Sequence, residues 1–423
     1  MSSIGTTAGS IAGLYAVVLQ SEEEGKGKGV PDDVAEKKHH LKNGKGFRNP
    51  WDSYGDLTPW GFFWNTFWRK ITRQQHHPNT TPPTVPVQTP SFLPTRATPN
   101  LRATWLGHAC YYIEFPSGLR VLFDPVFEDC CAPVQIKSLK RYTPPPCEIE
   151  DLPVVDVVVI SHSHYDHLSY PSVMRIKEKW PGVVFCVPLG LGKWFAGCGV
   201  REVVELDWWE TRELRFESGK EGSGGSVTSS EGKGDAISAT IGALPCQHVS
   251  ARTPFDKNTT LWASWSVESG GSKVYFAGDT GYRTVPKLPP GTDDYSPAYA
   301  HLPHCPAFAE IGKHRGPFDL GLIPIGAYEP RYMFSGMHAD PKDAVNIFVD
   351  TKCKRALGMH WGTWVLTEED VLEPPRKLVE ALRWKGVERV RERSGDGKEE
   401  EVEVFGVCDI GESREFESGV TEE

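Results

Sequence analysis

A cluster of metal-binding residue types directly after a hydrophobic segment constrains this chain more than any other part of its sequence. Residues 154–160 are aliphatic except for Asp156, which predicts a buried β-strand. The pattern His-x-His-x-Asp-His follows directly, in His162, His164, Asp166 and His167. Three imidazoles and one carboxylate in six residues are costly to bury without partners, and a divalent metal supplies such a partner. The sequence therefore predicts a metal centre at the carboxyl end of a sheet strand.

Three further metal-binding residues each follow a later hydrophobic run. They are His248, Asp279 and His360. A single histidine after a strand is more often structural, but three such cases together favour one shared site. The four ligands of the His-x-His-x-Asp-His pattern already exceed what one catalytic zinc with an open position needs. The seven residues together suit two metal ions.

Ten short hydrophobic runs predict the strands of the folded domain. They span residues 103–106, 110–115, 119–123, 154–160, 183–187, 237–244, 262–267, 274–277, 320–325 and 356–359. Several are continuous rather than alternating, which is typical of sheets covered on both faces. Helices are predicted over residues 171–179, 341–349 and 375–384, and Asp340 is the expected N-cap of the second. Strands punctuated by helices indicate an α/β sandwich.

Changes in composition divide the chain into segments. The expected segments are a disordered or targeting segment (residues 1–45), an aromatic and basic extension (46–77), a Pro/Thr-rich connector (78–100), the folded domain (101–416) and a tail (417–423). Two flexible inserts, residues 217–235 and 284–304, are expected to interrupt the folded domain.

Charge and cysteine content argue against several classes of protein. Lys and Arg number 46 against 56 Asp and Glu, so the net charge is −10 and nucleic acid is not expected as a partner. Ten cysteines without a Cys-x-x-Cys pair argue against a disulfide framework or a structural zinc site, and they are expected to be reduced. No run of apolar residues is long enough for an ordinary transmembrane helix.

Motifs that metal binding alone does not require are spread over residues 46–416. They include Phe47-Arg-Asn-Pro-Trp51, Thr104-Trp-Leu-Gly-His-Ala109, Phe276-Ala-Gly-Asp-Thr-Gly-Tyr282, Ile323-Pro-Ile-Gly-Ala-Tyr-Glu-Pro-Arg331, His338-Ala-Asp-Pro341 and His360-Trp-Gly-Thr363. With the metal-binding residues, they resemble the N-acylphosphatidylethanolamine-hydrolysing phospholipase D family of the metallo-β-lactamase superfamily. The resemblance implies an αββα sandwich of two mixed β-sheets flanked by helices, with an N-terminal aromatic-rich extension. The two inserts and the first 45 residues depart from the family pattern.

The resemblance also implies a cofactor of two Zn²⁺ per chain and a role for each site residue. One zinc would be held by His162, His164 and His248, the other by Asp166, His167 and His360, and Asp279 would bridge both. A hydroxide activated by the two zincs would attack a phosphodiester, with Asp279 and His338 as catalytic residues. His338 would contact the substrate, and Arg331 and Tyr332, which lie close to it in sequence, are expected to reach the substrate as well. His108 is expected either to support a metal ligand or to pack in the core, and Asp124 is expected to orient a metal-binding histidine.

The implied reaction splits N-acylphosphatidylethanolamines into N-acylethanolamines and phosphatidic acid. Such a substrate lies in a membrane, and the aromatic side chains of residues 46–77 suit docking at the headgroup level. The alternative is that these aromatics pack onto the sandwich as an extra layer.

The expected location is intracellular and peripheral to a membrane, mitochondrial or endomembrane, and the resemblance implies a homodimer. Two other functions stay open: another hydrolase of the superfamily (a nuclease or a lactonase), or a non-catalytic membrane lipid-binding protein on the same fold.

Overall fold

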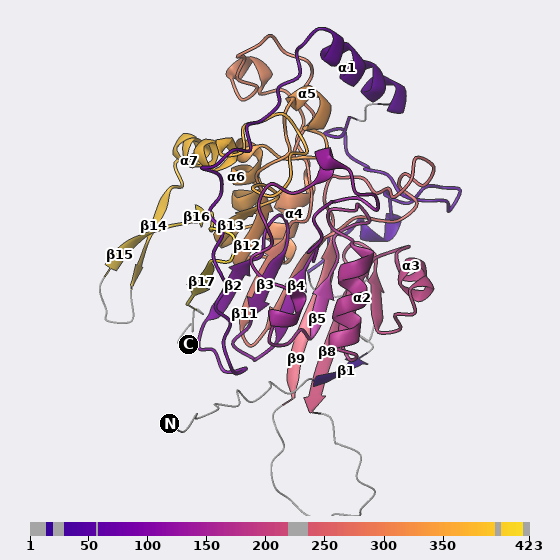
Figure 1. The fold of residues 1–423 in the computed structure, drawn as a ribbon, viewed down its shortest axis with the longest axis vertical. Coiled ribbons are helices and arrows are strands. Elements are labelled where there is room, and N and C mark those ends of the chain that lie inside the picture. Colours follow the sequence, from indigo (N-terminus) through magenta and orange to yellow (C-terminus); the bar gives the residue numbers. More distant parts are fainter. Residues whose placement is uncertain (1–13, 20–28, 56–57, 219–235, 394–398, 418–423) are drawn as a thin grey trace, which may run out of the picture.

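Two mixed β-sheets lie face to face in the middle of the molecule (Figure 1). The computed structural model describes residues 14–19, 29–55, 58–218, 236–393 and 399–417. The first sheet has eight strands in the order β1 (Leu14–Leu19), β8 (Thr211–Ser218), β9 (Ile237–Leu244), β10 (Ser264–Ser269), β11 (Ser272–Phe276), β12 (Phe318–Pro324), β13 (Cys353–Met359) and β16 (Phe405–Gly406). The second has seven in the order β17 (Ser413–Phe416), β2 (Leu101–Trp105), β3 (Tyr111–Glu114), β4 (Arg120–Phe123), β5 (Val157–Val159), β6 (Val184–Pro188) and β7 (Val203–Leu206).

Each sheet joins an antiparallel half to a parallel half. Strands β8 to β11 pair antiparallel, and β11, β12, β13 and β16 pair parallel. In the second sheet, β17, β2, β3 and β4 pair antiparallel, and β4 to β7 pair parallel. The predicted pair of mixed sheets is confirmed. A separate hairpin of β14 (Arg389–Arg393) and β15 (Glu399–Glu403) projects from the body (Figure 1).

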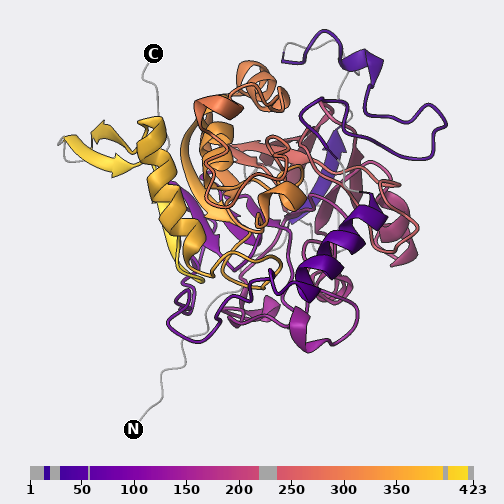
Figure 2. The same ribbon diagram turned by 90° about the horizontal axis from the view of Figure 1, so that it is seen from above.

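Helices cover the outer face of each sheet, as the view from above shows (Figure 2). The helices are α1 (Pro59–Ile71), α2 (Tyr170–Lys179), α3 (Gly192–Gly197), α4 (Ala307–His314), α5 (Arg331–Phe334), α6 (Pro341–Asp350) and α7 (Glu373–Lys385), with short 3₁₀ turns at Val34–Glu36, Lys137–Leu139, Ile149–Asp151 and Pro297–Tyr299. Helices α2 and α3 pack on the second sheet, and α4, α6 and α7 pack on the first. The three predicted helices correspond to α2, α6 and α7. The predicted cap of α6 is confirmed, since Asp340 Oδ1 accepts a hydrogen bond from Asp343 N at 2.8 Å.

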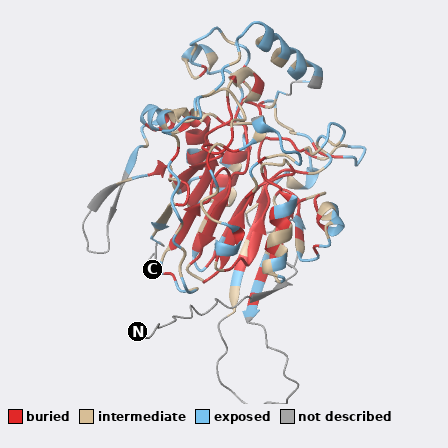
Figure 3. Ribbon diagram, in the orientation of Figure 1, coloured by how far each residue is buried: buried red, intermediate tan, exposed pale blue. Residues whose placement is uncertain are grey.

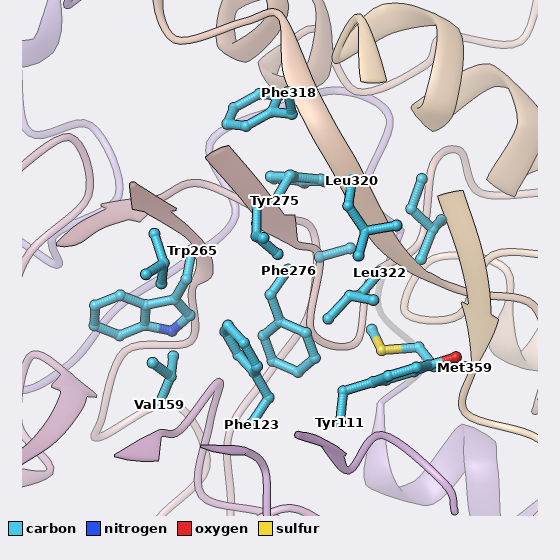
Figure 4. Close-up of a cluster of buried hydrophobic side chains, with 14 of the residues drawn as sticks. Tyr111, Phe123, Val159, Trp265, Tyr275, Phe276, Phe318, Leu320, Leu322 and Met359 are labelled. Atoms are coloured by element: carbon cyan, nitrogen blue, oxygen red, sulfur yellow. The ribbon is translucent and has the colours of Figure 1, made fainter. Parts of the chain in front are cut away.

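Large apolar side chains fill the space between the sheets (Figure 4), and most residues of the central strands are buried (Figure 3). Phe123 of β4 faces Phe276 of β11, with ring centroids 4.7 Å apart. Trp265 of β10 is fully buried, and its indole nitrogen donates to the carbonyl of Ile160 at 3.0 Å. This bond joins the first sheet to the start of the histidine-rich loop.

The segments before the domain lie partly against its surface. Residues 14–19 form β1, and residues 29–45 are held where His39 and His40 hydrogen-bond the buried carboxylate of Asp207 at 2.6 and 2.7 Å. These parts of residues 1–45 are therefore ordered, whereas residues 1–13 and 20–28 lie outside the described residues. Phe47 and Trp51 pack onto the hydrophobic core, as the packing alternative expects.

The second insert is packed rather than loose. Arg283 donates to the Asp294 carbonyl at 2.6 Å, and Tyr295 donates its hydroxyl proton to Asp343 of α6 at 2.5 Å. Arg331 adds an ion pair to Asp294 at 3.1 Å. These bonds tie residues 284–304 to α5 and α6. Of the first insert, residues 219–235 lie outside the described residues.

None of the helices in the described part of the chain is long and apolar enough to span a bilayer.

The contact between the sheets generates a stability prediction. Phe276→Ala removes the ring that packs on Phe123, and we expect the free energy of unfolding to fall by about 3–5 kcal/mol. Phe255→Ala is the matched control, because that ring is 94% exposed, and its effect should stay below about 0.5 kcal/mol. Urea unfolding followed by tryptophan fluorescence measures both. Equal effects of the two substitutions would contradict the packing described here.

Candidate metal centre

Seven predicted metal ligands meet at one edge of the sandwich. His162, His164, Asp166 and His167 come from the loop after β5, while His248, Asp279 and His360 follow β9, β11 and β13. Strands β9, β11 and β13 run in the same direction in the first sheet, so their carboxyl ends share an edge. The structure thus brings together residues that lie as far apart in sequence as 162 and 360.

The first group of ligands consists of three imidazoles. His162 Nε2 lies 2.8 Å from His164 Nδ1, and His248 Nε2 lies 3.3 Å from the same atom. The three ring nitrogens could therefore bind one ion. This is the ligand set that the family resemblance assigns to the first metal.

The second group combines a carboxylate with two imidazoles. Asp166 Oδ2 lies 3.5 Å from His167 Nε2 and 3.5 Å from His360 Nε2. His108 also reaches this carboxylate, with its Nε2 at 3.1 Å. These four side chains can converge on one cation.

Asp279 lies between the two groups. Its Oδ2 is 3.1 Å from His167 Nε2 and 3.0 Å from His360 Nε2. The same oxygen is 3.9 Å from His162 Nε2 and 3.8 Å from His248 Nε2. One carboxylate oxygen can thus contact ligands of both groups.

Several buried atoms of this cluster have no hydrogen-bond partner in the described part of the chain. They are His167 Nε2, His360 Nδ1 and Nε2, and Asp279 Oδ1. Unsatisfied buried polar atoms destabilise a fold, and a bound cation would satisfy those that face it. The donor set of imidazole nitrogens and carboxylate oxygens suits a divalent transition metal. The residues present therefore fit a metal centre.

The electrostatic field of the cluster also favours a cation. Burial alone would lower the pKa of His360, but Asp279 and Asp166 outweigh it and raise the pKa to about 9. Burial would raise the pKa of Asp279, but His167 and His360 hold it well below its usual value. In the first group, burial and the neighbouring imidazoles lower the pKa of His162 and His248, which keeps both rings neutral and able to bind a metal.

Hydrogen bonds behind the ligands fix their orientation. Asp124 Oδ2 lies 2.6 Å from His167 Nδ1, which leaves Nε2 of that ring directed at the metal centre. The Met337 carbonyl does the same for His248, at 2.9 Å from its Nδ1. The sequence indicated the role of Asp124 but not that of Met337, since a backbone carbonyl leaves no sequence signal.

Three residues around the site adopt left-handed backbone conformations that only glycine adopts easily. These are His108, Asp124 and His360, with φ of +51°, +38° and +61°. Such conformations cost free energy and persist where packing enforces them, often at functional sites. His108 is held further by its ring, whose centroid is 4.1 Å from that of His360. It therefore positions both Asp166 and His360.

The predicted substrate contacts separate into two places. His338 lies at the metal centre: its Nδ1 is buried, has no hydrogen-bond partner among the described residues and lies 3.9 Å from Asp279 Oδ2. Arg331 instead pairs with Asp343 at 2.8 Å and with Asp294 at 3.1 Å, so its described contacts anchor the second insert. Tyr332 lines a cavity of about 890 Å³ between α1 and that insert. The structure thus brings His338, but not Arg331 or Tyr332, to the metal ligands.

Comparison with known proteins gives the class of this fold and site. A family model described as a beta-lactamase superfamily domain matches residues 119–290 and 293–361. The chain belongs to the metallo-β-lactamase superfamily and is a metal-dependent hydrolase. Among solved structures, isothiocyanate hydrolase from Delia radicum gut bacteria aligns with a TM-score of 0.47 and 13% identity, over 75% of this chain and 99% of that chain.

Curated relatives identify the branch of the superfamily. N-acyl-phosphatidylethanolamine-hydrolyzing phospholipase D 1 of Caenorhabditis elegans is 37% identical over 288 residues, which are 67% of this chain and 70% of the relative. The mitochondrial protein of the same description from Saccharomyces cerevisiae is 33% identical over 67% of this chain, and the chain spans 52% of the yeast relative. This chain belongs to the N-acylphosphatidylethanolamine-hydrolysing phospholipase D family.

The carboxylate behind His167 generates a prediction about metal affinity. In Asp124→Asn the amide can no longer hold His167 as strongly, and we expect metal affinity to fall about 10- to 100-fold. Competition with a chelator, followed by elemental analysis, measures this. Asp293→Asn is the control, because Asp293 pairs with Lys342 at an exposed position. Undiminished affinity in Asp124→Asn would contradict the role given to this carboxylate.

Proposed function

We propose that this chain is a zinc-dependent phosphodiesterase of the phospholipase D type that hydrolyses N-acylphosphatidylethanolamines. The observation that carries the proposal is Asp279, which lies within 4 Å of ligands of both groups in a chain of this family. Two zinc ions at this place would lower the pKa of a water molecule and neutralise the phosphodiester anion. His162, His164 and His248 would hold one ion, and Asp166, His167 and His360 the other.

Asp279 and His338 are the chain's own reacting groups in this proposal. Asp279 Oδ1 is buried without a hydrogen-bond partner among the described residues, so it can orient the attacking water and accept its proton. His338 Nδ1 is similarly unpartnered beside Asp279, so it can contact the phosphate. The water oxygen bonds to phosphorus and the bond to the ethanolamine oxygen breaks. The leaving oxygen takes up a proton, giving an N-acylethanolamine and phosphatidic acid.

The exposed aromatic face of α1 supports docking on a membrane. Trp60 is 66% exposed and Trp68 59%, and the helix stands at the surface (Figure 3). The Trp60 ring packs on its own helix, with centroids 5.6 Å from those of Phe63 and Trp64. Tryptophan and phenylalanine on one face of a surface helix are typical of insertion at the level of lipid headgroups.

This proposal places the protein peripherally on a membrane. The yeast relative is described as mitochondrial, which supports a mitochondrial membrane as one location. The homodimer is proposed from the family resemblance, and sedimentation velocity tests it. The net charge of −10 disfavours the alternative of a nuclease, which needs a basic surface for phosphates.

The first test of the proposed function uses vesicles that contain an N-acylphosphatidylethanolamine. We expect the zinc-loaded protein to release N-acylethanolamine, measured by mass spectrometry, and His164→Ala to release at least about 100-fold less, because it loses a metal ligand. If the wild-type protein binds two zincs per chain and releases no product, this substrate class is rejected. The remaining function would then be that of another hydrolase of the superfamily.

The second test concerns α1. In the double variant Trp60→Ala/Trp64→Ala we expect the equilibrium constant for vesicle binding to fall about tenfold or more. The reason is that burying each large apolar side chain contributes about 1.5–3 kcal/mol. Co-sedimentation with vesicles measures it. Trp384→Ala is the control, because this tryptophan is also exposed but lies on α7. Unchanged binding of the α1 variant would show that the membrane contacts another surface.

A further inference from the structure

An ion pair joins the last turn of α1 to the loop that follows His360. Arg69 Nε donates to Glu368 Oε1 at 3.3 Å, and Arg69 Nη2 donates to Oε2 of the same carboxylate. The two side chains are only 14% and 19% exposed. A bidentate and largely buried pair of this kind fixes geometry more strictly than a surface ion pair.

The residues after α1 add hydrogen bonds to the same contact between α1 and the loop that carries Glu368. The backbone N–H of His76 donates to Glu368 Oε2 at 3.0 Å, and the His76 ring nitrogen Nδ1 lies 2.7 Å from the Glu368 carbonyl. Arg69 Nη2 also donates to the Gln74 carbonyl at 2.9 Å. Glu368 therefore binds both the end of α1 and the segment that leaves it.

From Glu368 the contacts continue to a metal ligand. Glu368 N donates to the carbonyl of Glu329 at 3.2 Å, and the neighbouring Glu369 carboxylate accepts from Glu329 N at 3.1 Å. Gly326, three residues before Glu329, packs so closely on the backbone of His360 that a Cβ there would lie 2.5 Å from the His360 carbonyl oxygen. The loop that receives Arg69 is thus hydrogen-bonded to the segment after β12, and that segment packs tightly on the backbone of the metal ligand His360.

A second contact lies near the start of α1. The Phe62 ring meets the Phe334 ring edge to face at 6.1 Å between centroids, and Phe334 lies 6.3 Å from the ring of His338. This apolar contact alone would allow α1 to pivot. Contacts at both ends of the helix define its direction relative to the metal centre.

We propose that Arg69 is a positioning residue: by pairing with Glu368 it holds α1 at one orientation, so that a helix seated in the bilayer presents the lipid phosphate to the metal centre. The inference rests on the proposed function. Its physical reason is that a reacting group displaced by about 1 Å can lose about 100-fold in rate. Arg69 touches neither substrate nor metal in this role. Its loss should therefore affect only substrates that reach the site from a membrane.

The experiment compares two substrates with the full-length, zinc-loaded protein. One is an N-acylphosphatidylethanolamine in phosphatidylcholine vesicles, and the other is soluble bis-p-nitrophenyl phosphate. The variants are Arg69→Ala, Glu368→Gln and the double variant, with Lys70→Ala as the matched loss of an adjacent positive charge. Co-sedimentation gives the bound fraction, so that turnover is expressed per vesicle-bound enzyme. Metal content and thermal unfolding are measured for each variant.

In Arg69→Ala we expect turnover per vesicle-bound enzyme to fall about tenfold or more, and turnover of the soluble diester to stay within about twofold of wild type. Glu368→Gln should lose turnover in the same way as Arg69→Ala. The double variant should be no slower than either single variant, because all three remove the same interaction. Lys70→Ala should match wild type on both substrates per bound enzyme. If Arg69→Ala does not fold, Glu368→Gln carries the test.

Three results would overturn the inference. The first is an equal loss of turnover on both substrates in Arg69→Ala, which a merely structural role predicts. The second is no loss of turnover on vesicles. The third is a loss in the double variant that equals the sum of the losses in the single variants. A wild-type protein that hydrolyses the soluble diester but no vesicle-borne lipid would overturn the proposed function first, and this inference with it. If the wild-type protein hydrolyses both substrates and Arg69→Ala has the same turnover as wild type, this inference alone is overturned.

Discussion

The position of the Asp279 carboxylate is the constraint on which the rest of the site depends. Its Oδ2 lies within 4 Å of ring nitrogens of His162, His167, His248, His338 and His360. The end of β11 must therefore come very close to the histidine-rich loop after β5. Gly278 permits this, since a Cβ at that residue would lie 2.7 Å from the Ser161 side chain, and its φ of +59° suits glycine. The packing of Phe123 on Phe276 and the bond from Trp265 to Ile160 hold the two sheets at the distance that the site needs.

Much of this arrangement could be predicted from sequence because its signals are local. A hydrophobic run predicts a buried strand wherever it occurs, and residues with metal-binding side chains directly after such runs collect at one sheet edge. Helices α2 and α6 were predictable from a proline in the first turn, and α6 also from the capping side chain of Asp340 before it. The two mixed sheets followed from the family resemblance, which the family model supports.

What could not be predicted depends on contacts between residues far apart in sequence. The aromatic residues of the extension differ in burial. Phe47 and Trp51 pack on the domain, while the aromatic side chains of α1 are exposed. Both parts carry aromatic residues in the sequence, so only the docking of each part decides which of them are buried. Arg331 ends one of the family motifs but pairs with Asp294 of the insert and Asp343 of α6. The bond between Arg69 and Glu368 spans 299 residues and has no local pattern.

The distribution of the ligands between the sheets has a consequence for the stability of the whole protein. Four of the seven ligands follow β5 of one sheet, and three follow strands of the other. A metal ion bound by ligands from both sheets acts as a cross-link between them, much as a disulfide would in a smaller protein. Binding and folding are then thermodynamically linked, because the unfolded chain cannot assemble this ligand set. The supply of metal in the cell would thus govern how much folded protein persists, and not only how fast each molecule works.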